Sequence, residues 1–230
     1  MDKVILEGSP DIVVSLRRNA RAKRISLRVS QLDGRVTTTA PGWTPLREIE
    51  QFVRAKENWI RLNLSEQLDA VTPSIGGTIL FQGEHTAILS TRGRSVRFDG
   101  RSLLVPGNPD RAPARLAGFL KTLARQRLAN ACDVFSARSG QAYSRITLRD
   151  TRSRWGSCTS NGNLMFSWRL VMAPSPVLDY VAAHEVAHLS EMNHSPAYWK
   201  VVETIYPNYA GPRGWLRTNG KHLHAYRFGN

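Results

Sequence analysis

Residues 184–194 read His184-Glu185-Val186-Ala187-His188-Leu189-Ser190-Glu191-Met192-Asn193-His194. His184 and His188 are four residues apart, a spacing that places two helical side chains about 40° apart around the axis and one turn along it. Both imidazoles can therefore bind the same metal ion. Glu185 is one step further round and can reach a water molecule on the open side of that ion. This His-Glu-x-x-His arrangement is typical of zinc hydrolases, in which the histidines hold the metal and the glutamate takes a proton from water.

A catalytic zinc site usually has three protein ligands and a water molecule, so the motif needs a third ligand. His194 is the best candidate. On a continued helix, the six steps from His188 would amount to about 600° and would turn His194 away from the metal. We therefore expect the helix, which begins near Pro176, to end at Met192-Asn193, because asparagine tolerates a left-handed backbone. Cys158 is a weaker candidate, since three histidines suffice.

The residues around the motif favour a buried helix with a catalytic metal. Small and apolar side chains fill 181–183 and 186–187, as a buried active-site helix requires. A structural metal site has no use for a carboxylate beside the water position, so Glu185 favours catalysis. Metzincins have a glycine where this chain has Glu191, and they have a later methionine turn that is missing after Met192. The spacing alone therefore does not indicate a metzincin.

Length and composition are those of an ordinary globular protein: 230 residues, of which 41% are hydrophobic and 22% are charged. Cys132 and Cys158 are too few for a disulfide framework or a four-thiolate zinc site. No apolar run approaches the ~18 residues of a membrane span. The first residues lack a basic segment followed by an apolar one, so we expect no secretory signal, no membrane partner and a cytoplasmic location.

The charge is strongly positive, with 32 Lys and Arg residues against 18 Asp and Glu residues and a net charge of +14. Such a field attracts polyanions, including nucleic acids and nucleotides. The chain has no zinc-finger, helix-turn-helix or RNP motif, so a nucleic-acid partner rests on charge alone. It also lacks the Gly-x-x-x-x-Gly-Lys-Ser/Thr loop, which excludes a P-loop mechanism.

The distribution of turns and apolar periods predicts an α+β protein with two regions. Residues 1–109 are expected to form a β-rich N-terminal region with one long helix, and residues 110–230 a catalytic domain. The expected elements of the first region are a hairpin over 24–30 and 35–40, a helix over 45–68 and short strands over 75–105. Those of the second are a helix over 111–140, strands over 146–149 and 163–168, and the metal-bearing helix. We find no internal repeat.

Several segments together resemble the YgjP-like metal-dependent hydrolases, which are grouped as zinc metallopeptidases and are related to the WLM and SprT-type proteases. These segments are 22–29, Trp59-Ile60, 152–158, 163–174, 177–181 and 184–199. The resemblance implies a zincin-like catalytic domain behind a β-rich region. It also implies that His184, His188 and His194 bind Zn²⁺ and that Glu185 is the general base, although other divalent transition metals suit the same ligands.

The substrate is less well defined. Arg152 and Arg154 precede a strand that should run near the metal helix, and they could bind a substrate carboxylate or phosphate. Solvated surface arginines are the alternative. Tyr198 and Trp199 are expected to pack beneath the site. A peptide is the first choice of substrate; the resemblance also leaves open a pyrophosphatase acting on UTP, and the charge leaves open a nucleic-acid-associated hydrolase.

Overall fold

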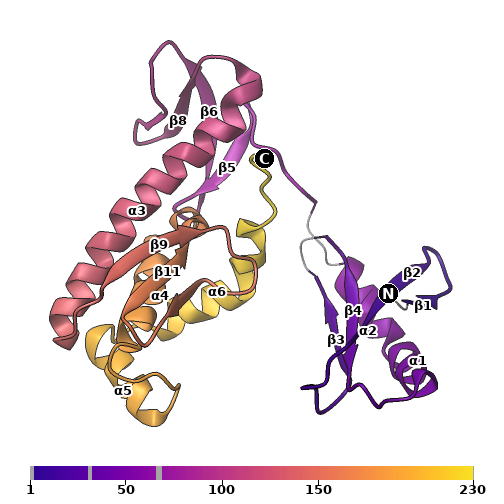
Figure 1. Ribbon diagram of the computed structural model, residues 1–230. Coiled ribbons are helices and arrows are strands. Elements are labelled where there is room, and N and C mark those ends of the chain that lie inside the picture. Colours follow the sequence, from indigo (N-terminus) through magenta and orange to yellow (C-terminus); the bar gives the residue numbers. More distant parts are fainter. Residues whose placement is uncertain (1–2, 31–32, 66–68, 230) are drawn as a thin grey trace. The chain divides into compact units, whose positions relative to one another are not determined.

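The computed structural model describes residues 3–30, 33–65 and 69–229 (Figure 1). Its helices and mixed sheets make an α+β protein, which confirms the predicted fold class. The chain divides into two compact units, Met1–Asp69 and Ala70–Asn230. This division comes earlier than the predicted boundary after residue 109. The reason is that Ile79 and Leu103, from the strands before that boundary, share one buried core with Leu116 of the helix after it.

The first unit is a four-stranded sheet with two helices. Its elements are β1 (Lys3–Leu6), β2 (Ile12–Arg18), β3 (Ser26–Val29), β4 (Val36–Ala40), α1 (Leu46–Ala55) and α2 (Glu57–Ser65). The strand order is β1-β2-β4-β3, with β2 and β4 parallel and the other pairs antiparallel. The predicted hairpin is β3–β4. The predicted single helix is broken at Lys56, and its expected end at 66–68 lies outside the described residues.

The second unit begins with another four-stranded sheet, made of β5 (Thr78–Phe81), β6 (Glu84–Thr91), β7 (Arg97–Phe98) and β8 (Ser102–Pro106). Its order is β5-β6-β8-β7, again with a parallel central pair and antiparallel outer pairs. Both sheets therefore have the same topology. The sequence shows no repeat because different side chains occupy matching places: Val14 and Val36 begin the parallel pairing in one sheet, Ala87 and Ser102 in the other.

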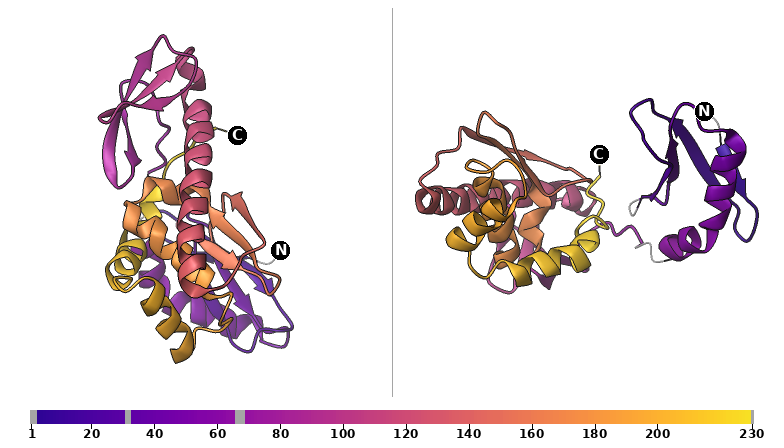
Figure 2. Two further views of the ribbon diagram at one scale, coloured as in Figure 1. Left: turned by 90° about the vertical axis from the view of Figure 1, so that its left-hand side faces the viewer. Right: turned by 90° about the horizontal axis from the view of Figure 1, so that it is seen from below.

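A long helix and a third sheet form the frame of the remaining chain. After η1 (Pro109–Arg111), α3 (Ala112–Ser139) runs past both sheets of this unit (Figures 1 and 2). Leu116, Leu120, Ala124 and Leu128 recur at helical spacing and are fully buried. The helix ends at Gly140, whose φ of 68° suits a residue without a side chain. The third sheet, β9 (Arg145–Arg149), β10 (Gly156–Cys158) and β11 (Asn163–Ser167), has the order β10-β11-β9.

Three helices complete the unit after η2 (Trp168–Met172): α4 (Ser175–Ala187), α5 (Pro196–Ile205) and α6 (Ala210–Leu223). The helix that was predicted to carry the metal ligands is α4, and it ends before the predicted Met192-Asn193. The N–H groups of Leu189 and Ser190 donate to the carbonyls of Val186 and Ala187, each three residues back, which tightens the chain into a turn. Across the described residues, none of the helices combines the length and the apolar character needed to cross a membrane.

Candidate metal centre

Three histidine side chains converge at the end of α4. His184 lies in its last turn, His188 caps it, and His194 returns from the segment before α5. One ligand nitrogen from each lies within 4.8 Å of the others. The Nε2 atoms of His184 and His194 are 3.1 Å apart. This separation is close to the ~3.3 Å edge of a tetrahedron with nitrogen ligands about 2.0 Å from zinc.

Burial favours the neutral form of two of the rings, and a hydrogen bond orients one of them. Nδ1 of His188 lies 3.0 Å from the carbonyl oxygen of Glu191, and donation to that oxygen leaves the lone pair on Nε2. Burial, together with the positive charges of His188, His194 and Arg213, lowers the pKa of His184 to about 3. Burial also lowers the pKa of His188. Neutral imidazoles offer lone pairs to a metal, so the donor set fits a divalent ion.

Tyr198 of α5 packs against all three rings and is fully buried. Its ring stacks on His188 with centroids 4.5 Å apart, and it meets His194 edge-on at 4.8 Å. Its hydroxyl donates to the backbone carbonyl of His184 at 2.9 Å. Nδ1 of His184 is buried and has no hydrogen-bond partner among the described residues. Packing against Tyr198 therefore holds the His184 ring in place, although no described residue makes a hydrogen bond at its Nδ1.

Glu185 of α4 lies against strand β10. Its side chain is only 5% exposed, and a Cβ atom added to Gly156 would lie 2.5 Å from its Oε1. Burial raises the pKa of Glu185 to about 8, against the opposing charge of Arg154. Burial and the charge of Glu185 raise the pKa of Cys158 to about 11. Cys158 is therefore a neutral thiol, and it is not part of the histidine cluster.

Comparison with known proteins gives the family. The family model described as YgjP-like, metallopeptidase domain, matches residues 23–219. The chain belongs to the YgjP-like family. Membership assigns this YgjP-like protein to the metallopeptidases at family level and implies a metal ion, which agrees with the three converging histidines.

Comparison with individual proteins adds little for this YgjP-like chain. No curated protein matches it. Among solved structures, the crystal structure of the metallopeptidase zymogen of Pyrococcus abyssi abylysin matches with 17% identity and a TM-score of 0.36. The match covers 41% of this chain and 93% of that chain. A likeness this weak carries no argument, so the site is interpreted from its own geometry.

The two arginines predicted to bind substrate lie in the exposed loop before β10. Arg154 is near enough to Glu185 to act on the pKa of its carboxyl group. Arg152 acts instead on Asp150 and His224. The ring of His224 stacks on Trp155 with centroids 4.7 Å apart, and the metal cluster does not include it. Arg154 is thus the arginine placed beside the candidate base.

One charged residue beside the histidines was not predicted. Arg213 of α6 holds its guanidinium carbon 4.5 Å from the ring centre of Trp199, and it contributes to the low pKa of His184. The sequence did not predict α6, because glycines at 211 and 214 and a proline at 212 resemble a turn. In the sequence, only the positive charge of Arg213 pointed to a role for this residue.

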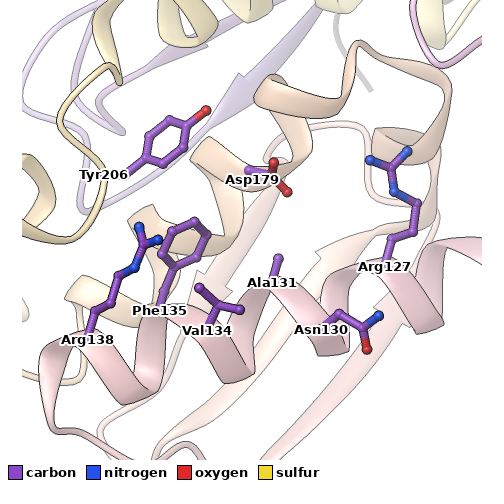
Figure 3. A pocket seen from close by; sticks show the side chains of 8 residues that line it. All are labelled: Arg127, Asn130, Ala131, Val134, Phe135, Arg138, Asp179 and Tyr206. Atoms are coloured by element: carbon purple, nitrogen blue, oxygen red, sulfur yellow. The ribbon is translucent and has the colours of Figure 1, made fainter.

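A separate cavity of about 390 Å³ lies between α3 and α4. Figure 3 shows Arg127 and Arg138 of α3 at its two ends, with Asp179 of α4 between them. Burial raises the pKa of Asp179, and Arg127 opposes this. None of the side chains lining the cavity belongs to the histidine cluster, so it is separate from the candidate metal centre.

Proposed function

We propose that this protein is a zinc-dependent peptidase in which His184, His188 and His194 hold the metal and Glu185 is the general base. The observation that carries the proposal is the convergence of three imidazoles at the end of the helix that also carries the buried Glu185. A ligand set made only of imidazoles suits zinc and its neighbours among the transition metals rather than magnesium or calcium.

The reaction assigned to these residues is hydrolysis of a peptide bond. Zinc, when bound, supplies a Lewis acid that polarises the substrate carbonyl and lowers the pKa of a water molecule. Glu185 accepts a proton from the attacking water as the oxygen bonds to the carbonyl carbon. As the C–N bond breaks, Glu185 delivers that proton to the departing amine nitrogen. Arg213 supplies positive charge near the developing oxyanion.

Strand β10 is a suitable place for an extended peptide. Within the described sheet it pairs only with β11, so its other edge has backbone N–H and C=O groups available for an added strand. Gly156, on the same strand, lies against Glu185. A peptide that pairs with β10 would therefore run past the proposed base. Arg152 and Arg154 precede this strand and are proposed to bind carboxylate groups of the substrate.

Nucleotide hydrolysis is the second candidate. Arg154 and Arg213, both exposed and close to the centre, favour it because guanidinium groups bind phosphates as readily as carboxylates. In that case the water would attack phosphorus instead of a carbonyl carbon, with the same residues in the same roles.

The test is hydrolysis of denatured casein and, separately, of UTP by the zinc-loaded full chain. We expect casein cleavage, and we expect Glu185→Gln to reduce it at least about 100-fold. Glu203→Gln is the matched control, because Glu203 is an exposed carboxylate on α5. Cleavage that survives Glu185→Gln would overturn the assignment of the base. Hydrolysis of UTP without cleavage of casein would favour the second candidate.

A further inference from the structure

The sheet β10-β11-β9 has two different faces. Leu164 and Phe166 of β11 are buried in the core beneath it. Side chains alternate along a strand, so Asn163 and Met165 point to the opposite, outer face. On this face lies a groove of about 470 Å³. None of the three histidines lines it, and Arg154 is the one residue that it shares with the proposed substrate site.

The groove has the chemistry of an anion-binding surface. Its lining contains three arginines, five hydroxyl side chains and one amide, but no acidic side chain. These residues are Arg145, Thr147, Arg149, Thr151, Ser153, Arg154, Ser157, Thr159 and Asn163, with Leu164 and Met165 as the apolar members. Asp150 follows Arg149 in the chain but binds Arg169 through both carboxylate oxygens, at 2.6 and 3.0 Å. We call this surface the basic groove.

The strand register sets out these groups in rows. Asn163 pairs with Arg145, and Met165 lies between Thr147 on one side and Ser157 on the other. Arg145 and Arg149 are four residues apart on one strand, which separates their Cα atoms by about 13 Å. Charges spread over this length suit successive phosphates of a chain better than one small anion.

We propose that the basic groove binds the phosphodiester backbone of a nucleic acid. The net charge of +14 supplies the long-range attraction. No aromatic ring lines the groove, so base stacking has no platform there and the contacts would be with phosphates. Binding is therefore expected to be independent of base sequence and sensitive to salt.

The groove and the metal centre lie on opposite faces of the same strand. Gly156 lies against Glu185, and burial and the charge of Glu185 raise the pKa of Cys158. Ser157, between Gly156 and Cys158 in the strand, lines the groove. A nucleic acid in the groove would contact Arg154 but none of the three histidines. The proposal does not depend on the peptidase assignment, and either can fail without the other.

The test is fluorescence anisotropy of the full chain with a labelled DNA oligonucleotide, single-stranded or duplex, at several salt concentrations. The test variant is Arg145→Gln with Arg149→Gln. The matched control is Arg92→Gln with Arg94→Gln, because these two arginines are exposed in the loop between β6 and β7 of the same unit. We expect the test variant to bind the oligonucleotide at least about 10-fold more weakly than the unaltered chain. The slope of log affinity against log salt concentration should become shallower by about 2. The affinity of the control variant should fall less than about 3-fold.

Three results would overturn the proposal: no binding of the unaltered chain at low salt, equal losses in both variants, or displacement of the oligonucleotide by equimolar inorganic pyrophosphate. The last would indicate a site for small phosphates. Circular dichroism shows whether the test variant is folded. Should it not fold, Thr147→Glu, which places a negative charge on the same face, is expected to give the same loss, and unchanged binding by it would contradict the proposal.

Discussion

Gly156 lies directly against the side chain of Glu185. A Cβ atom on Gly156 would come within 2.5 Å of Oε1 and 2.6 Å of Cγ of Glu185, much closer than atoms pack. The strand can therefore approach the helix only because residue 156 has no side chain. This contact holds the carboxylate between α4 and β10 and helps to keep it buried.

Gly156→Ala is expected to displace Glu185 and to lower kcat/KM for a casein-derived peptide about 100-fold, because small displacements of a reacting group are costly. Zinc affinity, measured by isothermal titration calorimetry, should change less than about 3-fold. Gly118→Ala is the control, since a Cβ atom on Gly118 of α3 meets nothing within 4 Å. Full activity in Gly156→Ala would mean that the carboxylate is not the base.

His194→Ala is expected to lower zinc affinity more than about 100-fold, beyond the loss usual for residues that only support a ligand. The reason is that its Nε2 atom lies 3.1 Å from that of His184. Calorimetric titration with zinc measures the change. His222→Ala, which removes an exposed histidine elsewhere in the unit, should leave the affinity unchanged. If zinc binds His194→Ala as tightly as the unaltered chain, the ligand set is wrong.

Arg213→Ala is expected to lower kcat about 100-fold, the usual loss when one group that stabilises an oxyanion is removed. Zinc content, measured by atomic absorption, should not fall, because the substitution removes a positive charge from beside the cation site. Arg217→Ala removes an exposed arginine of the same helix and should have little effect. Equal kcat values for the two variants would mean that Arg213 packs on Trp199 and does not stabilise the oxyanion.

Asp150 links acid stability to the core. Burial raises the pKa of Asp150. The hydrogen bonds and the charge of Arg169 lower this pKa by more than burial raises it, so the net shift is downward. Arg169 is buried and also donates to the carbonyls of Leu223 and Tyr226. A lowered pKa in the folded state means that the ion pair stabilises the fold above the unfolded pKa of about 3.9. This contribution is lost as the pH falls through the folded pKa.

Asp150→Asn is therefore expected to lower the free energy of unfolding by about 1–3 kcal/mol at pH 7, since it leaves a buried guanidinium without its counter-charge. The difference from the unaltered chain should shrink below pH 4. Urea denaturation at both pH values measures it. Asp110→Asn removes a carboxylate from η1 and should show no such trend. If the difference in the free energy of unfolding were the same at both pH values, the ion pair between Asp150 and Arg169 would not contribute to stability against acid.

Much of the metal centre could be predicted because it depends on local spacing. His184 and His188 are four residues apart, so they can bind one ion only if they share a face of a helix. His194 is six residues after His188 and can join them only if the helix ends between the two. The point at which it ends was predicted too late. The chain turns through backbone hydrogen bonds directly after His188, and Ser195 caps α5 by accepting from the N–H of Tyr198. Neither feature depends on Asn193.

The rest of the site depends on contacts between distant segments, which no local pattern encodes. Arg213 approaches the histidines because Trp199 provides a surface for its guanidinium. The division of the chain follows from packing of the β5–β8 strands on α3, whereas the predicted boundary rested on a turn-rich segment at 106–109. The repeated sheet topology could not be predicted either, since strand order is a property of pairing and not of sequence pattern.

The position of Trp199 has a practical consequence. Its ring centre lies 6.1 Å from that of His184 and 6.0 Å from that of His194. An indole so close to the cation site should lose emission when a quenching ion such as Co²⁺ replaces zinc. The chain thus contains a built-in optical reporter, with which occupancy can be followed in real time without any label.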